Sequence, residues 1–141
     1  MRIYALMTKD CDNETIRTLL KKVGLDPDSK KRVKEFSLGM KNRLGIAMAL
    51  CGNPRFMILD EPMNGLDPTG MKQMSKVLIE ESKKGTTIII SSHMLNEMSQ
   101  IASRFGFIKA GSIVKERLKS DMEKLGENIE QLYSEYVEDE V

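Results

Sequence analysis

Two adjacent carboxylates, Asp60 and Glu61, end a short apolar segment of the chain, Phe56 to Leu59, and Pro62 follows them. An apolar run of this length bounded by turn residues predicts a strand buried on both faces, as in a parallel sheet. Open α/β sheets bind their ligands at the carboxyl ends of such strands. Because neighbouring carboxylates repel each other without a cation, the pair predicts a metal-dependent site. The alternative is an acid pair that only caps the following turn.

Two further stretches carry residue types suited to phosphate chemistry. Ser37 and Gly39 stand at the predicted start of a helix that runs to about Cys51. The N–H groups and positive dipole end of a helix N-terminus bind phosphate, and glycine lets a backbone approach closely. Taken alone, the pair is also typical of an ordinary helix cap. His93, the single histidine, follows the second predicted strand, where a structural role is the alternative.

Asp67 precedes Pro68 at the predicted start of another helix. Aspartate is a favoured N-cap and proline a favoured first helical residue, so the local sequence already gives Asp67 a structural role. A contact with a partner is an equally weighted alternative for this side chain.

The composition is that of one globular domain. With 141 residues and a formal net charge of +1, the chain has a sizeable core and no basic bias for nucleic acid or anionic membranes. Cys11 and Cys51 indicate neither a disulfide scaffold nor a metal site, which favours a reducing compartment. No apolar run approaches the roughly 20 residues of a membrane span, and the first residues become polar too soon for a signal peptide. We therefore expect a cytoplasmic protein that binds no nucleic acid.

The elements that position these residues follow two patterns. Apolar spacing over residues 3–23, ending at Gly24, and the helix from Ser37 predict a purely helical lobe over residues 1–53. Strands then alternate with helices, which predicts a parallel α/β sheet. The expected elements are strands at 56–60 and 86–91, helices starting at Asp67 and over 94–103, strands at 104–109 and 112–115, and one amphipathic helix within residues 118–141.

Taken in chain order, the stretches resemble the motifs of an ABC-transporter ATPase. The signature motif, Walker B motif, D-loop and H-loop correspond to Phe36-Ser37-Leu38-Gly39-Met40, Asp60-Glu61, Asn64-Gly65-Leu66-Asp67 and Ser91-Ser92-His93. The stretch SLGMKNRLGIAMAL is most similar to exporters of the bacitracin and lantibiotic resistance type. Leu38 and Met40 stand where the general signature has glycine and glutamine.

The resemblance implies a site for ATP and Mg²⁺, in which Ser37, Gly39 and Met40 clamp the γ-phosphate held by the opposite subunit. Asp60 holds Mg²⁺, and Glu61 orients or deprotonates the attacking water. His93 touches the γ-phosphate, and Asp67 crosses the dimer interface. It also implies two partners. One is a second ABC ATPase subunit in a head-to-tail dimer, and the other is a membrane permease that holds the chain at the inner face of the membrane.

One part of the pattern is missing. A P-loop requires Gly-x-x-x-x-Gly-Lys-[Ser/Thr], and no Gly-Lys pair occurs in the 141 residues. We therefore expect the C-terminal part of an ABC ATPase: a partial P-loop NTPase α/β core over residues 54–117 with the first part of its sheet missing, a helical lobe before it, and residues 118–141 after it. Such a chain is not expected to hydrolyse ATP alone.

Three functions remain open at this point. The chain is the ATPase subunit of an ABC exporter, a non-catalytic partner that donates its signature helix to a complete ABC ATPase, or an ABC-type ATPase outside transport. The absence of a coiled-coil insertion, a second cassette and a basic surface bias argues against the third. The first two share every residue discussed above, so the sequence does not separate them.

Overall fold

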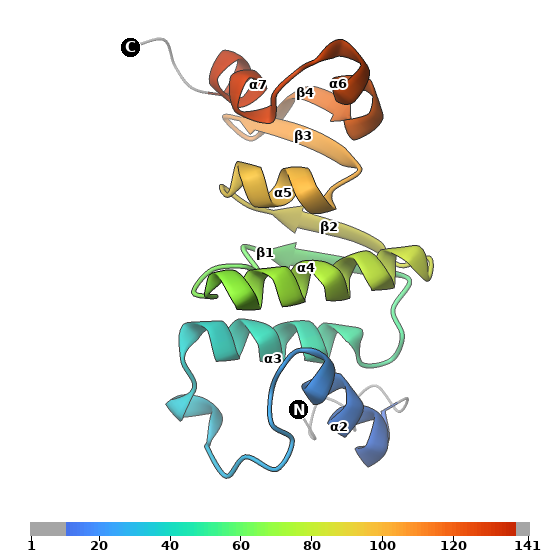
Figure 1. Cartoon of the computed structure of the whole chain (residues 1–141), viewed down its shortest axis with the longest axis vertical. Coiled ribbons are helices and arrows are strands. Elements are labelled where there is room, and N and C mark those ends of the chain that lie inside the picture. Colours follow the sequence, from blue (N-terminus) through green and yellow to red (C-terminus); the bar gives the residue numbers. More distant parts are fainter. Residues whose placement is uncertain (1–10, 138–141) are drawn as a thin grey trace. The chain divides into compact units, whose positions relative to one another are not determined.

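The computed structural model describes residues 11–137, which fall into two compact units divided between Ser92 and His93 (Figure 1). The sequence predicts two helices over residues 3–23, separated near residues 9–13, and the first of them lies outside the described residues. Each unit is a compact group of residues. The divisions predicted after residues 53 and 117 separate regions of different function, and the two compact units do not test those predictions.

The first unit consists of helices and a pair of strands. Its elements are α2 (Asn13–Lys22), the 3-10 helix η1 (Val33–Glu35), α3 (Leu38–Leu50), β1 (Phe56–Asp60), α4 (Pro68–Lys83) and β2 (Thr87–Ser91). β1 and β2 are parallel and adjacent, with α4 as the crossover between them. The register runs from Phe56 opposite Thr87 to Asp60 opposite Ser91, so the carboxyl ends of both strands meet at one edge. The predicted parallel α/β arrangement is confirmed.

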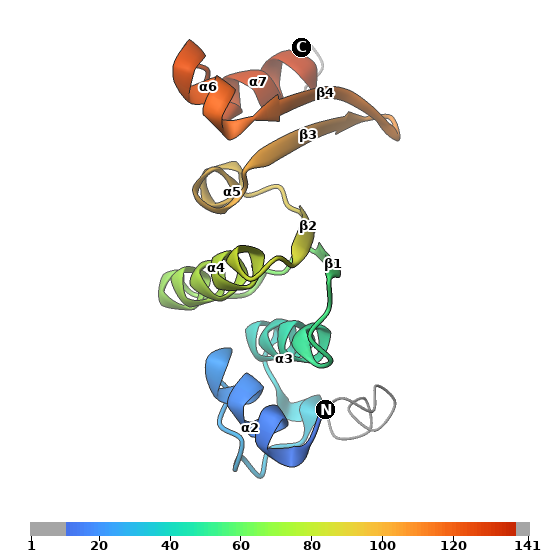
Figure 2. The ribbon, with the colours of Figure 1, turned by 90° about the vertical axis from the view of Figure 1, so that its right-hand side faces the viewer.

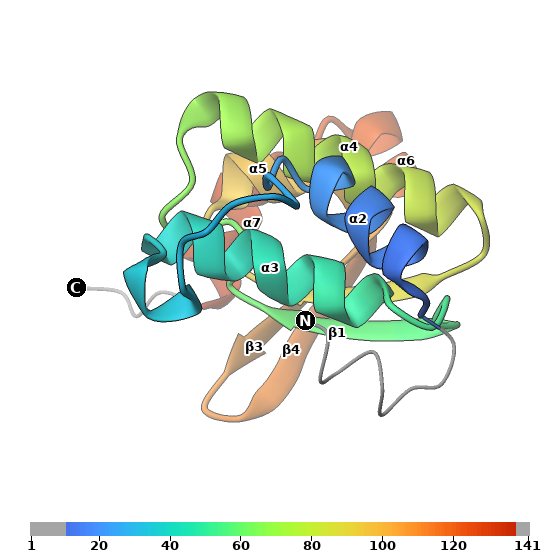
Figure 3. The same ribbon diagram turned by 90° about the horizontal axis from the view of Figure 1, so that it is seen from below.

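Short side-chain caps determine where the helices of this unit begin. Ser37 accepts a hydrogen bond from the Met40 N–H at 3.2 Å at the start of α3. Asp67 accepts one from the Gly70 N–H at 2.9 Å at the start of α4, where Pro68 is the first residue. Each cap satisfies a backbone donor that the first helical turn leaves unpaired. Both predicted helix starts are confirmed, and α2 lies beside α3 (Figure 3).

The two strands are covered on one face only within residues 11–137. Met57 and Leu59 are buried, whereas Ile58 is 70% exposed and its partner Ile89 is 52% exposed. Figure 2 shows α4 on one side of the strands. The prediction that Phe56–Leu59 is buried on both faces is therefore wrong for this structure. A continuous apolar run shows that both faces suit burial, but burial itself requires elements that cover both faces.

A buried carboxylate connects α2 with α4. The Glu81 side chain is 9% exposed and accepts hydrogen bonds from Lys22 at 2.5 Å and from Lys84 at 2.9 Å. Burial by itself raises the pKa of Glu81, but the bonds from the two ammonium groups more than offset it, so the pKa lies below its usual range. The ionised carboxylate therefore stabilises the packing of α2 on α4.

Replacing Glu81 with glutamine should lower the free energy of unfolding at neutral pH by about 1–3 kcal/mol, because the substitution leaves Lys22 with a weaker partner in a half-buried position. Since the folded pKa lies below the unfolded value near 4.5, this stabilisation is complete above that value and is lost as the pH falls through the folded pKa. Urea unfolding at pH 7 and pH 3 should therefore show a difference between Glu81→Gln and wild type that shrinks in acid.

Glu80 provides the matched control for this prediction. It lies next to Glu81, its carboxylate is 3.7 Å from the same Lys22 ammonium, and its side chain is 45% exposed. Exposed ion pairs contribute little, so Glu80→Gln should change the stability by less than about 0.5 kcal/mol. Equal losses for the two substitutions would show that burial of Glu81 is not what matters.

The second unit combines an antiparallel ribbon with three short helices. Its elements are α5 (Leu95–Ile101), β3 (Arg104–Lys109), β4 (Ser112–Leu118), α6 (Lys119–Leu125) and α7 (Ile129–Tyr136). The single amphipathic helix predicted for residues 118–141 is wrong. Gly126 ends α6 with a φ of +67°, and Asn128 starts α7 by accepting the Glu130 N–H at 2.7 Å. The apolar spacing continues across this break, which is why it resembles one helix.

The two cysteines form a disulfide, which corrects the expectation drawn from their number. Cys11 and Cys51 are bonded across 40 residues, with their Cα atoms 5.9 Å apart. The bond joins the residue before the α2 cap to the end of α3. Two cysteines so far apart in the chain carry no spacing signal, and only the packing of α2 beside α3 places them together. Within residues 11–137, no helix has the length and apolar character to cross a membrane.

Candidate functional site

The start of α3 and the turn before α4 interlock closely. A Cβ atom on Gly39 would lie 2.4 Å from the carbonyl oxygen of Gly65, and one on Gly65 would lie 2.9 Å from Cγ of Leu38. The Asn42 amide donates to the Asn64 carbonyl at 2.6 Å. The stretches that resemble the signature motif and the D-loop therefore form one packed surface within this chain. The close approach expected at Gly39 is made by the chain's own backbone.

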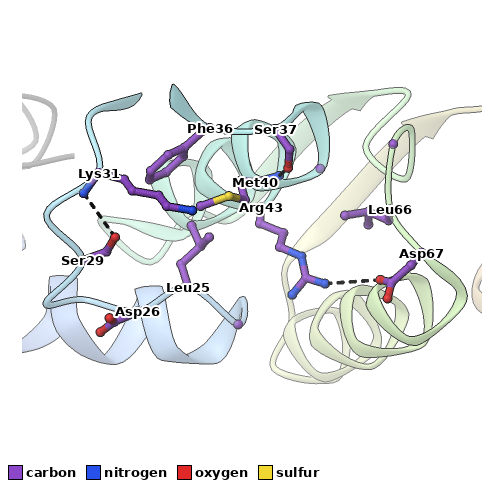
Figure 4. Close-up of a pocket in the computed structure, with 13 residues that line it drawn as sticks. Leu25, Asp26, Ser29, Lys31, Phe36, Ser37, Met40, Arg43, Leu66 and Asp67 are labelled. Carbon is purple, nitrogen blue, oxygen red and sulfur yellow. Dashed lines mark hydrogen bonds and ion pairs between the residues drawn. The ribbon is translucent and has the colours of Figure 1, made fainter. Parts of the chain in front are cut away.

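A pocket of about 540 Å³ opens beside this surface (Figure 4). Two cations, Lys31 and Arg43, and two carboxylates, Asp26 and Asp67, contribute to its wall. The opposite charges balance, so the wall itself has no strong preference for an anion. The full lining consists of Gly24, Leu25, Asp26, Ser29, Lys31, Phe36, Ser37, Gly39, Met40, Arg43, Gly65, Leu66 and Asp67.

The N-terminus of α3 adds backbone N–H groups to the wall of this pocket. The Ser37 side-chain oxygen accepts a hydrogen bond from the Met40 N–H. Within residues 11–137, no acceptor is bonded to the N–H of Leu38 or Gly39. Free N–H groups at the positive end of a helix dipole suit a phosphate oxygen. Ser37, Gly39 and Met40, which were predicted from the sequence, all line the pocket.

The acid pair lies at the carboxyl end of the strands with a serine beside it. The Ser91 hydroxyl donates to the Asp60 carboxylate, and the Glu61 N–H donates to the Ser91 carbonyl at 3.1 Å. Glu61 has a left-handed backbone with a φ of +45°. Such a conformation costs a non-glycine residue on the order of 1–3 kcal/mol and is common at functional sites.

The acid pair is chemically suited to Mg²⁺. Magnesium prefers oxygen ligands and is usually held by one or two protein carboxylates together with phosphate oxygens and water. Asp60 and Glu61 provide such carboxylates. Within residues 11–137 no group of three or more acidic, histidine or cysteine side chains forms a metal site by itself. The donor set therefore fits a cation that is shared with a nucleotide.

The remaining predicted site residues are placed as follows. Asp67 caps α4 and lies beside Arg43, so its local role is confirmed and its contact with a partner stays a prediction. His93 is the first residue of the second unit, where its carbonyl accepts the Leu95 N–H at 3.2 Å. Its contact with a γ-phosphate also stays a prediction.

Sequence reasoning gave no role to Asn42 and Arg43 of α3, which hold the site together. It placed Ser91 in the motif at the end of β2 but did not predict its bond to Asp60. Polar residues on a helix are usually read as a solvated face. One signal was present for Arg43, because a glycine inside the first turn of α4, Gly70, costs about 1 kcal/mol in helix stability and requires a packing reason. The structure supplies this reason, since the Arg43 guanidinium occupies the space that a Cβ of Gly70 would fill.

Comparison with known proteins agrees with this geometry. The family described as ABC transporter matches residues 5–64. The chain is 45% identical over 123 residues to the lantibiotic transport ATP-binding protein SrtF of Streptococcus pyogenes, a match covering 87% of this chain and 52% of SrtF. It is 41% identical over 125 residues to the bacitracin transport ATP-binding protein BcrA of Enterococcus faecalis, covering 88% of this chain and 41% of BcrA.

Solved structures give the same result for the fold. A structure of the ATP-binding subunit of an ABC transporter is similar with a TM-score of 0.81 and 26% identity, over 95% of this chain and 59% of that one. A dimeric bacterial ABC transporter cassette has a TM-score of 0.68 at 22% identity, over 75% and 46% of the two chains, which is a likeness of fold. This chain spans about half the length of SrtF. It belongs to the ABC transporter ATP-binding family and corresponds to part of the ATP-binding domain of such proteins.

Proposed function

We propose that this chain serves an ABC exporter by presenting the N-terminus of α3 and the Asp67 turn to ATP held by a second ATPase subunit. The observation that carries the proposal is the interlock of Gly39 with Gly65, which makes these two stretches a single surface beside the pocket. Relatives named for lantibiotic and bacitracin transport support an export role.

In this proposal the residues act in two groups. Ser37, Gly39 and Met40 bind the terminal phosphate through the N-terminus of α3. The second group lies at the carboxyl end of β1 and faces this chain's own nucleotide position, where Asp60 would hold Mg²⁺ and Glu61 would orient or deprotonate the attacking water. When bound, Mg²⁺ neutralises charge on the phosphate oxygens. The Ser91 hydroxyl holds the Asp60 carboxylate at the strand end, and the Ser91 carbonyl holds the backbone N–H of Glu61 there. His93 contacts the terminal phosphate, and Asp67 contacts the second subunit.

The proposed partners are a second ABC ATPase subunit and a membrane permease. The permease would hold the chain at the inner face of the membrane, and its identity would determine the transported molecule. The exposed apolar face around Ile58 and Ile89 is separate from the pocket residues, so the proposed nucleotide surface does not depend on it.

Nucleotide-dependent association tests the proposal. The chain is mixed with complete SrtF in the presence of Mg²⁺ and either a non-hydrolysable ATP analogue or ADP, and the mixture is analysed by size-exclusion chromatography. We expect joint elution with the ATP analogue only, because the α3 N-terminus binds the terminal phosphate that ADP lacks. Ser37→Arg should abolish it, and Lys76→Ala on the exposed side of α4 should not. Joint elution that is independent of nucleotide or of Ser37 would contradict the proposal.

The chain alone should not bind ATP with micromolar affinity. The residues proposed to act contact only metal, water and the terminal phosphate, and the 141 residues contain no Gly-Lys pair to hold the other phosphates. Calorimetric titration of the purified chain with MgATP should therefore give no measurable heat of binding at micromolar concentrations. Micromolar binding that is lost in Asp60→Asn would mean that another segment replaces the P-loop.

A further inference from the structure

Arg43 connects three elements around the proposed nucleotide surface. Its Nη1 donates to the Val23 carbonyl at 3.1 Å, at the end of α2, and to the Gln73 side-chain oxygen at 3.0 Å, on α4. Its Nη2 lies 3.8 Å from the Asp67 carboxylate (Figure 4). The side chain is 16% exposed, so these partners replace most of its contact with water. Hydrogen bonds to a buried charged group are among the stronger ones in proteins.

Two glycines make room for the guanidinium. A Cβ on Gly24 would lie 2.4 Å from Nη1 of Arg43, and a Cβ on Gly70 would lie 2.4 Å from Nη2. Gly70 stands within α4, where alanine would favour the helix by about 1 kcal/mol. The absence of a side chain at Gly70 therefore leaves room for the guanidinium at a cost to helix stability, whereas at Gly24 the left-handed backbone (φ +74°) is already a reason for glycine. Gln73 is itself held by a bond to the Lys22 carbonyl at 3.4 Å.

We propose that Arg43 is the positioning residue of the nucleotide surface: it fixes the N-terminal turn of α3 against the Asp67 turn. The role of Arg43 in nucleotide binding rests on the proposed function, whereas the position of its guanidinium rests on the hydrogen bonds to Val23 and Gln73 and the distance to Asp67. Ser37 and Gly39 lie on the same helix as Arg43, and Asp67 lies 3.8 Å from its guanidinium. The side chain therefore adds a link between the two parts of the surface to those made by Gly39 with Gly65 and by Asn42 with Asn64.

Lysine should not replace Arg43. The guanidinium bonds the Val23 carbonyl and the Gln73 oxygen through Nη1 and holds a second nitrogen, Nη2, near Asp67. A lysine has one nitrogen, so an ammonium placed to bond Val23 and Gln73 has no second donor group to lie beside Asp67. Arg43→Lys therefore keeps the positive charge but loses the planar arrangement of donors. An effect of this substitution would come from the positions of the donors and not from the charge.

Amide hydrogen exchange of the chain measures this positioning directly. In Arg43→Lys, exchange of the Met40 and Gly70 amides, which form the two caps, should accelerate roughly tenfold or more. Amides of the β1–β2 ladder should change much less. Gln73→Ala, which removes one partner and leaves the arginine, should give a smaller effect at the same amides. Lys76→Ala, which removes an exposed cation from α4, is the control.

Two exchange results would overturn the proposal. Proportional acceleration at all protected amides would show a purely structural role in global stability, and unchanged exchange at Met40 and Gly70 would show no role. Gln73→Ala decides the matter in the same way if Arg43→Lys fails to fold. A second readout is the turnover of complete SrtF in the presence of the chain, where Arg43→Lys should lower kcat severalfold and leave KM for ATP nearly unchanged. If the wild-type chain does not associate with SrtF, the proposed function fails while the exchange test still decides the role of Arg43.

Discussion

Replacing Gly39 with alanine is expected to lower the free energy of unfolding by about 2–3 kcal/mol. The added carbon would lie 2.4 Å from the carbonyl oxygen of Gly65 and 3.2 Å from a Leu66 methyl group. The nearest atom belongs to a backbone that cannot rotate away, so either α3 or the Asp67 turn must shift. The shift would also separate the two parts of the proposed nucleotide surface.

Gly45 is the matched control, because it lies on the same helix and receives the same methyl group. Apart from its chain neighbours and the backbone of its own helix, no heavy atom of the described residues lies within 4 Å of a Cβ built there. Only the helix preference of alanine remains, so Gly45→Ala should raise the stability by about 0.5–1 kcal/mol. Urea unfolding of the two variants in parallel should therefore give shifts of opposite sign. Losses of similar size would show that the interlock of Gly39 with Gly65 does not stabilise the fold.

The features that the sequence predicted correctly depend on neighbouring residues. Ser37 and Asp67 cap their helices by accepting hydrogen bonds from the N–H three residues later. Contacts over so few residues depend on the types of the neighbouring residues, which the sequence gives directly. The parallel pairing of β1 with β2 followed from strands that alternate with a helix. For the same reason the motif resemblance could be read from short stretches in chain order.

The features that the sequence did not predict depend on residues far apart in the chain. The close approach at Gly39 was assigned to a phosphate, whereas the structure places the Gly65 carbonyl there. The disulfide between Cys11 and Cys51 follows from the packing of α2 beside α3, which no spacing rule gives. The slot for Arg43 is built from three elements, so the arginine by itself resembles any polar residue on a helix.

The second large effect is an asymmetry between two site residues. In the proposed arrangement, Ser37 faces ATP held by the second subunit, while Asp60 and Glu61 face the nucleotide position of this chain. Ser37→Arg places bulk and charge at the start of α3, where the terminal phosphate binds. Glu61→Gln changes a carboxylate that the partner's nucleotide does not meet. A complete partner should therefore depend on Ser37 and be indifferent to Glu61.

Steady-state ATP hydrolysis by complete SrtF, titrated with an excess of this chain, tests the central claim most directly. The wild-type chain, Glu61→Gln and the control Lys76→Ala should stimulate turnover to the same extent, and Ser37→Arg should abolish the stimulation. Circular dichroism of each variant confirms that the loss is not one of folding. A wild-type chain without effect on turnover, or inhibition by Glu61→Gln as strong as that by Ser37→Arg, would contradict the claim that this chain presents its signature helix to ATP held by a partner.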